Sequence, residues 1–236
     1  MIPIRSDWLG AVGAVVLLGT GCGTETGNPE GYAVELGYNA RTSQPEAVGF
    51  EPTSRVQVDA VWLRLADAHL EASCPGEPSR FDGIGLADHA GKTAAWQELA
   101  PSESEAAASY CGVGTWARVV DDGADDPAEV DGASVAITGW LQDGRSFAVQ
   151  IHRDIDLAVQ VDPDVDPTEA SWLMTFDLAT WLDADALEAL SDDAIWVDDR
   201  TAVGEGIADR MLDGVQLHQD FDHDGAIDRD DVRIDR

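Results

Sequence analysis

Hydrophobic and polar residues alternate with a period of two along much of the chain between residues 32 and 178. The clearest case lies between Ser134 and Ile151, where two alternating segments flank Gln142-Asp143-Gly144-Arg145. An Asp-Gly pair in this setting is a strong signal for a β-hairpin. Alternation buries one face of a strand and leaves the other face polar, so further strands are predicted at 32–38, 56–62, 113–120, 155–161 and 172–178.

Beyond Leu178 the apolar positions change to a helical spacing. Asp183 stands where it can cap a short helix that continues to Leu190. Apolar residues then recur at intervals of three and four from Val203 to Val215, which predicts a second helix running straight toward an acidic segment. The apolar stripe of this helix is expected to pack against the strands.

The strand and helix signals together predict the fold class. Several short alternating strands separated by turn signals are typical of an antiparallel β-sandwich or barrel. Residues 75–110 show no alternation and are predicted to form a long loop. We expect a mainly β protein, with an antiparallel β-sandwich domain at residues 32–178. A small helical C-terminal segment would follow at residues 179–236 and end in an acidic loop at residues 220–231.

The N-terminal residues predict a leader for export. Residues 1–7 carry one arginine and the free amine, and Trp8 to Thr20 is an uncharged, mainly apolar run of 13 residues. That length suits the core of a signal peptide and falls short of the ~20 residues that a membrane-spanning helix needs. We predict a signal peptide at residues 1–21, cleavage before Cys22, and a short polar tether at residues 22–31.

The chain contains three cysteines, and their number bears on the kind of leader. In an oxidising compartment Cys74 and Cys111 can pair, which leaves Cys22 as an odd thiol directly after small residues. A bridge between Cys74 and Cys111 would close a loop of about 37 residues and stabilise the fold by roughly 3–4 kcal/mol. Lipidation would use up the remaining cysteine.

The segment Leu17-Leu18-Gly19-Thr20-Gly21-Cys22 resembles the lipid-attachment motif of bacterial lipoproteins. It departs from that motif because Leu18 lies four residues before the cysteine rather than three. The resemblance implies that the sulfur of Cys22 is diacylated, so that the lipid bilayer is the partner of this residue. Ordinary signal peptidase would also accept the small residues before Cys22, and a free secreted protein is therefore the alternative.

The residues after the cysteine carry a second resemblance. Thr26-Gly27-Asn28-Pro29 is similar to the opening of a group of uncharacterised Gram-negative lipoproteins that have a β-rich domain. Gly23 stands where an inner-membrane retention signal would place aspartate. The resemblance therefore implies the outer membrane, on either its periplasmic or its outer face.

Composition limits the partners of the chain. The formal net charge is −32, from 46 acidic and 14 basic residues, and hydrophobic residues make up 44%. A surface of this sign repels phosphate backbones and anionic headgroups, so we expect no nucleic-acid partner. The simplest interpretation is that acidic residues cover the whole surface as an adaptation for solubility or salt, so charge alone locates no site. Cations are the natural partners.

The acidic segment from Asp220 to Asp231 matches the twelve-residue calcium loop of EF-hands. Carboxylates at alternate positions converge as the chain curls around an ion, and Gly225 at position six permits the sharp turn. Oxygen ligands of this kind suit Ca²⁺. The predicted ligands, at positions one, three, five, seven, nine and twelve, are Asp220, Asp222, Asp224, the carbonyl of Ala226, Asp228 and Asp231.

Two features of the loop indicate a structural ion. Position twelve is Asp231 where the commoner loop has glutamate, and the shorter side chain predicts a Kd of roughly 10⁻⁵ to 10⁻³ M. Loops with aspartate at position twelve and one adjoining helix resemble dockerin-type modules, which carry two such loops, whereas this chain has no second copy. Ile227, at position eight, is expected to pin the loop to its neighbour. A chance match in an Asp-rich chain is the alternative.

The sequence offers no motif of a known catalytic site. Its five histidines show no paired metal spacing, and neither Gly-x-Ser-x-Gly nor His-Glu-x-x-His occurs. We therefore expect a calcium-binding outer-membrane lipoprotein that is not an enzyme, with a protein or glycan partner that the sequence does not identify. Two alternatives stay open. One is a secreted hydrolase of unrecognised type, and the other is a carbohydrate-binding or adhesion module that exposes some of Trp62, Trp116, Trp140 and Trp172.

Overall fold

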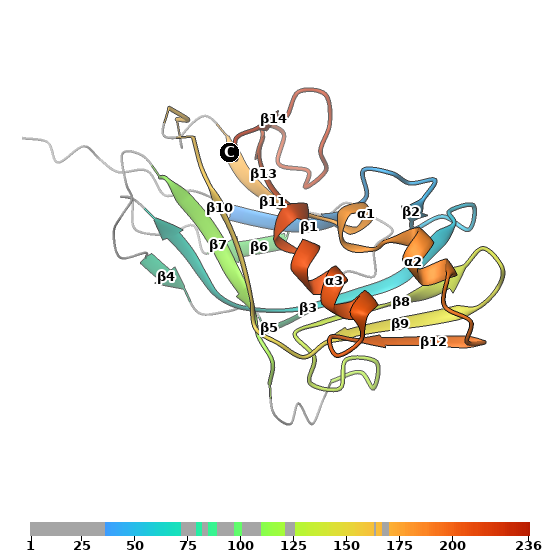
Figure 1. The fold of residues 1–236 in the computed structure, drawn as a ribbon. Coiled ribbons are helices and arrows are strands. Elements are labelled where there is room, and N and C mark those ends of the chain that lie inside the picture. The colour runs from blue at the N-terminus through green and yellow to red at the C-terminus, as the bar shows by residue number, and fades with distance from the viewer. Residues whose placement is uncertain are drawn as a thin grey trace, which may run out of the picture.

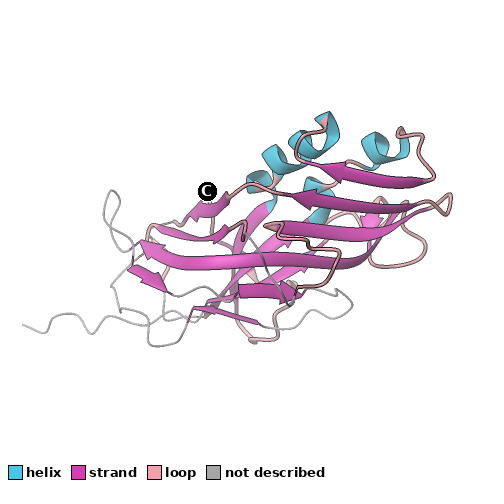
Figure 2. Ribbon diagram, turned by 90° about the horizontal axis from the view of Figure 1, so that it is seen from below, coloured by secondary structure: helices cyan, strands magenta, loops and turns pink. Residues whose placement is uncertain are grey.

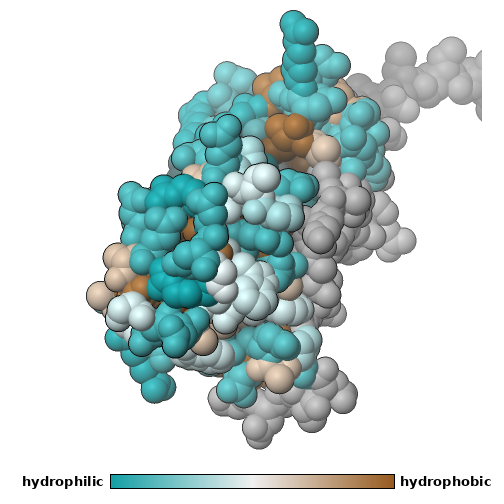
Figure 3. Space-filling model, turned by 90° about the vertical axis from the view of Figure 1, so that its right-hand side faces the viewer, coloured by the Kyte–Doolittle hydropathy of each residue, from teal (hydrophilic) through white to brown (hydrophobic). Residues whose placement is uncertain are grey.

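Two β-sheets and a few short helices make up the part of the protein that the structure describes (Figure 1). The structure is a computed structural model, which describes residues 36–71, 79–81, 85–88, 97–100, 110–120, 126–162, 164–166 and 170–236. The predicted mainly β fold is confirmed, and the helices gather at one end and one side of the strands (Figure 2). The face in Figure 3 is mostly hydrophilic, with small separated apolar areas, as the acidic composition leads one to expect.

Within the described residues, the larger sheet has nine strands and is organised around β3 (Val56–Glu71), the longest of them. Along the main path the order is β10-β7-β3-β8-β9-β12, and β2, β4 and β5 also pair with β3. The predicted hairpin is confirmed as β8 and β9, which pair antiparallel around a turn at Gly144, whose φ is +87°. The other bounds are β2 Val48–Gly49, β4 Ser79–Phe81, β5 Gly85–Asp88, β7 Gly112–Ala117, β8 Val135–Leu141, β9 Ser146–Ile151, β10 Ile155–Gln160 and β12 Ala194–Asp198.

In the smaller sheet, the described part of the chain supplies five strands in the order β14-β13-β11-β1-β6. The strand β1 pairs parallel with β11, and β9 and β12 in the larger sheet are also parallel, so both sheets are mixed. Alternation along one strand cannot reveal the direction of its partner, which is why the sequence predicts an antiparallel arrangement. The bounds are β1 Leu36–Arg41, β6 Gln97–Ala100, β11 Ser171–Asp177, β13 Val215–Asp220 and β14 Val232–Arg233.

Among the residues described, three α-helices and one 3₁₀ turn lie beside the sheets: α1 Leu178–Trp181, α2 Ala184–Glu188, α3 Ala202–Arg210 and Leu212–Gly214. The predicted cap is confirmed, because the Asp183 carboxylate accepts the Ala186 N–H at the start of α2 (3.1 Å). The prediction that the second helix continues through Val215 is wrong. Helix α3 ends at Arg210, and Val215 begins β13, because pairing with β11 outweighs the local helical spacing.

Two other predictions about organisation need correction. Residues 75–110, predicted as a long loop, include the strands β4, β5 and β6, which are too short to show a clear alternation. Residues 179–236, predicted as a helical segment, supply β12 to the larger sheet and β13 and β14 to the smaller one. Both sheets therefore draw strands from both sides of the predicted boundary at residue 178.

One hydrophobic core lies between the sheets and beneath the helices. Trp172 and Trp181 are fully buried in it, and the Trp172 ring meets Tyr110 edge to face with 5.6 Å between ring centroids. The indole N–H of Trp181 donates to the Met211 carbonyl (2.8 Å). Each of these two side chains buries a larger apolar area than an aliphatic core residue does, and so contributes more to the stability of the fold.

Several predictions concern residues that lie outside the described part of the chain. They are the signal peptide at residues 1–21, the tether at residues 22–31 with Cys22, and the proposed disulfide partner Cys74. Cys111 precedes β7, and its N–H donates to the Glu71 carbonyl (2.8 Å). The bridge between Cys74 and Cys111 stays a prediction. Among the described residues, no helix is both long and apolar enough to cross a membrane.

Candidate metal centre

The predicted calcium loop connects two paired strands of the smaller sheet. Asp220 is the last residue of β13, Val232 is the first residue of β14, and Gln219 faces Val232 in antiparallel register. The expected adjoining helix is absent from this position, so the similarity to dockerin-type modules does not extend to the element that leads into the loop. The paired strands hold the two ends of the loop close together.

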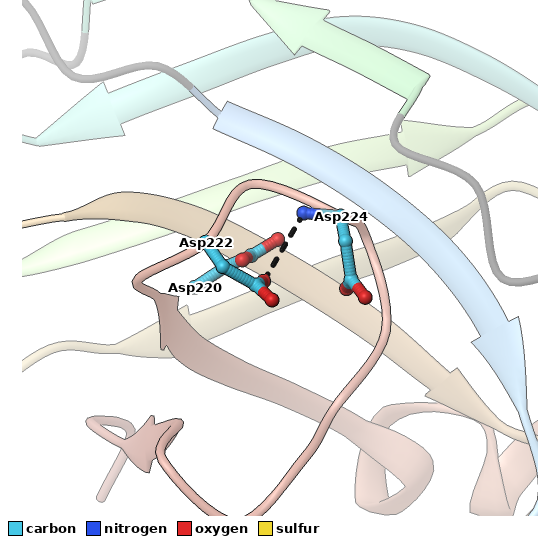
Figure 4. Close-up of side chains that lie close together, drawn as sticks. All are labelled: Asp220, Asp222 and Asp224. Atoms are coloured by element: carbon cyan, nitrogen blue, oxygen red, sulfur yellow. Dashed lines mark hydrogen bonds between the residues drawn. The ribbon is translucent and has the colours of Figure 1, made fainter.

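Three of the predicted ligands come together inside the curve of the loop (Figure 4). Asp220, Asp222 and Asp224 each offer one carboxylate oxygen, and these oxygens all lie within 4.8 Å of one another. Asp220 is only 1% exposed, whereas Asp222 and Asp224 face solvent. A small cluster of carboxylates, with one member buried and two accessible, has the ligand type and the open side that a calcium ion needs.

Backbone N–H groups hold this cluster in shape. The carboxylate of Asp220 accepts the N–H groups of His223 (2.7 Å) and Gly225 (3.0 Å), and Asp222 accepts the N–H of Asp224 (3.3 Å). His223 and Gly225 have positive φ values of 58° and 76°. The turn that the sequence predicts at Gly225 is therefore present, and the glycine adopts this conformation without the strain of a side chain.

The other two predicted carboxylates, those of Asp228 and Asp231, are not part of the cluster of three. Asp231 accepts hydrogen bonds from the N–H groups of Phe221 (3.3 Å) and Asp228 (2.8 Å), which ties the end of the loop to its beginning. Asp228 accepts the N–H of Asp230 (2.7 Å). Ala226, predicted to bind through its carbonyl, donates its N–H to Asp224 (2.7 Å). The predicted apolar pin, Ile227, is half-buried.

Burial raises the pKa of the Asp220 carboxyl group above its ordinary value, because the charged form loses hydration. The N–H groups of Gly225 and His223 act in the opposite direction, and the negative charge of Asp231 raises the pKa further. A negative charge at Asp220 is therefore costly in the absence of a cation. A cation between Asp220, Asp222 and Asp224 would offset that cost.

The loop lies against a polar layer on the outer face of the smaller sheet. Asn39, Thr175 and Gln216 stand side by side across β1, β11 and β13, and the Asn39 amide donates to the Gly225 carbonyl (2.8 Å) in a buried hydrogen bond. Arg41 donates to Thr175 and Gln216. Sequence reasoning missed Asn39, because nothing in the sequence marks a partner 186 residues away.

His218 belongs to the same layer. It is only 6% exposed, and burial, aided by the charge of Arg41, lowers its pKa to about 4. The ring nitrogen Nδ1 is buried without a hydrogen-bond partner among the described residues. The histidine is therefore neutral in the folded protein around neutral pH, and hydrogen bonds from Arg41 join the polar side chains beside it.

The remaining sequence candidates divide between core and surface. Trp172 is buried in the core, Trp62 and Trp116 are half-buried, and Trp140 is 46% exposed.

A cavity of about 300 Å³ lies beside α1 and α2, where Arg55 is paired with Asp185 and Glu188. No protein-family model, curated protein sequence or solved structure matches the chain.

Proposed function

We propose that this protein is an outer-membrane lipoprotein, anchored through acylated Cys22, whose β-sandwich is stabilised by one calcium ion in the loop at residues 220–231. Its role is binding or envelope structure rather than catalysis. The observation that carries the calcium proposal is the convergence of the oxygens of Asp220, Asp222 and Asp224 within 4.8 Å. The lipid anchor is supported by the leader and by the odd cysteine.

The chemistry of the loop fits calcium better than a transition metal. The convergent groups are all carboxylates, and hard oxygen ligands suit Ca²⁺, whereas imidazole and thiolate ligands suit zinc or copper. His223 does not belong to the convergent group, and its Nδ1 lies 2.8 Å from the Ser171 hydroxyl oxygen. The carbonyl of Ala226 and the carboxylates of Asp228 and Asp231 would complete the ligand set in the bound loop.

The proposed ion acts as a clamp for the C-terminal end of the chain. Beyond the loop, the Ile234 N–H donates to the Leu217 carbonyl (2.9 Å). The backbone of Asp235 forms an isolated antiparallel β-bridge with Val161, the residue after β10. The loop is also joined to β1 through Asn39. An ion that fixes the loop would therefore hold the last residues against both sheets.

Thermal unfolding in calcium and in chelator tests this clamp. Calcium at ten times its Kd should add about 1.4 kcal/mol to the free energy of unfolding and raise Tm by roughly 3–6 °C. Asp222→Asn and Asp224→Asn should reduce this increment. Asp230→Asn is the matched control, because Asp230 lies in the same loop but outside the predicted ligand set. A calcium increment that is absent, or that Asp230→Asn reduces equally, would contradict the proposal.

The anchor has its own test. Intact-mass analysis of the membrane fraction should show wild-type protein that begins at Cys22 and carries acyl chains. Cys22→Ala should abolish both the acyl mass and the membrane association. Finding wild-type protein that is soluble and free of acyl chains would support the secreted alternative instead, without affecting the calcium clamp.

A further inference from the structure

Two tryptophans project from the larger sheet into solvent. Trp140 on β8 is 46% exposed and Trp196 on β12 is 58% exposed, whereas Trp172 and Trp181 are fully buried. Leaving an indole ring in water forfeits hydrophobic stabilisation, so exposed rings gathered on one face indicate a binding surface. Trp116 is a different case, because the Arg118 guanidinium already lies over its ring, 5.7 Å from the centroid.

Strand register places Trp140 and Trp196 on the same face. Trp140 faces Ser146 on β9, and Trp196 faces Ala148 on the other edge of β9. Ser146 and Ala148 are two residues apart, so all four side chains point to one side of the sheet. Trp140 and Trp196 are two strand spacings apart across β9 and offset by two residues along the strands, which gives a separation of about 12 Å. We call this surface, formed by Trp140, Ser146, Ala148 and Trp196, the tryptophan face.

The opposite side of these strands is occupied by the core. Ile195 and Val197, which flank Trp196, are buried, and α3 covers that side (Figure 1). In the view from below, the helices lie beyond the strands rather than in front of them (Figure 2). Trp196 therefore cannot turn inward without reversing the buried residues of β12.

The Trp140 ring is held in a fixed orientation. Its indole N–H donates to the Asp59 carboxylate (2.7 Å), and the same carboxylate accepts the side-chain amide of Gln57 (3.0 Å). Only the small side chains of Ser146 and Ala148 stand between the two rings in the sheet. The face thus presents two exposed indole rings with small side chains between them, and hydrogen-bonding groups lie beside the Trp140 ring.

Charge and geometry argue against three kinds of occupant at this face or at the strand edge beside it. A net charge of −32 disfavours anionic ligands. A second copy pairing antiparallel along the edge strand β12 would set the acidic residues that flank it, Asp192, Asp193 and Asp199, near those of the partner. One small cation cannot touch both rings across about 12 Å, because cation–π contact requires about 6 Å.

We propose that the tryptophan face binds an uncharged polysaccharide chain. A sugar ring presents a flat C–H surface that stacks on indole, while its hydroxyl groups at the rim bond to Asp59 and Ser146. A chain repeats this surface along its length, so two of its rings can contact Trp140 and Trp196 together. This inference rests on the binding role proposed above and not on the calcium ion, since loop and face belong to different sheets.

Affinity electrophoresis of the full chain tests the proposal. Gels would contain hydroxyethyl cellulose, laminarin or mannan as neutral probes, with alginate as an anionic probe and polylysine as a cationic one. Retardation by at least one neutral glycan is expected. Trp140→Ala and Trp196→Ala should each weaken binding about tenfold. Leu212→Ala removes a comparably exposed apolar side chain elsewhere (48% exposed) and is the matched control.

Each result decides the proposal. Retardation by a neutral glycan that the tryptophan variants lose and Leu212→Ala keeps, with unchanged Tm, supports it. Trp140→Tyr should restore part of the binding, since tyrosine keeps an aromatic ring. The proposal is overturned if no neutral glycan retards the protein, if polylysine alone binds, or if the tryptophan variants abolish self-association instead. Glycan binding that persists in chelator would show that the tryptophan face works without the calcium ion. The two proposals can therefore fail independently of each other.

Discussion

Replacing Asn39 by leucine tests how the acidic loop is held to the sheet. The Asn39 amide donates to the Gly225 carbonyl at 2.8 Å, and Gly225 is buried. Leucine has nearly the same shape but no donor, so packing is kept while a buried carbonyl loses its partner. Such a group costs about 1–3 kcal/mol, which is the expected fall in the free energy of unfolding.

The assay is urea unfolding in chelator and again in excess calcium. Calcium affinity should also fall, because a loop that is less ordered before binding must lose more freedom when the ion binds. Gln57→Leu is the matched control, since it removes a strand amide whose hydrogen bond to Asp59 is exposed. That control should change the free energy by less than about 0.5 kcal/mol.

The reasoning would be refuted by one outcome above all. If Asn39→Leu unfolds within about 0.5 kcal/mol of the wild type in chelator, the bond between β1 and the loop contributes nothing measurable. An unchanged calcium Kd alongside lower stability would show that Asn39 supports the sheet but does not order the loop.

Three further predictions follow from helix α3 and from the buried histidine. Gly204→Ala should destabilise the protein in urea by about 1–3 kcal/mol, because the added Cβ would overlap the Asp198 carbonyl oxygen on β12. Gly206→Ala, where the nearest atom is 3.6 Å away on a flexible side chain, should stabilise by about 0.5–1 kcal/mol, and equal effects would contradict the close approach of α3 to β12. Acidification in chelator should also destabilise the wild type relative to His218→Gln. The pKa of His218 is lowered from 6.5 to about 4 by burial, so the unfolded chain binds the proton first and about 3 kcal/mol is lost as pH falls through this range. Parallel pH profiles of the two proteins would contradict this.

Local signals predict the parts of the fold that depend on near neighbours. The hairpin of β8 and β9 is confirmed because its turn and its alternation lie within 18 residues, from Ser134 to Ile151. The cap of α2 by Asp183 is confirmed for the same reason. The helical prediction for Val215 is wrong, because its spacing suits a helix locally and only the distant strand β11 makes it part of a sheet.

The candidate site shows the same division. Asp220, Asp222, Asp224 and Gly225 could be found in the sequence, because the curl of a short loop brings them together without help from elsewhere. Asn39 could not be found, since a strand asparagine has many possible partners. The exposure of Trp140 was also not predictable from alternation, which separates two faces without showing which one meets the core.

The position of β1 has a consequence for the order in which the chain can fold. This strand stands between β11 and β6, and its parallel partner β11 begins only at Ser171. A chain emerging from its N-terminus therefore carries an early strand whose main partner arrives much later. Contacts so distant in sequence form slowly, and until they form the edge of β1 that pairs with β11 is open to wrong association. We therefore expect β1 to be among the last strands to complete its pairing, because its partner β11 comes from the final third of the chain.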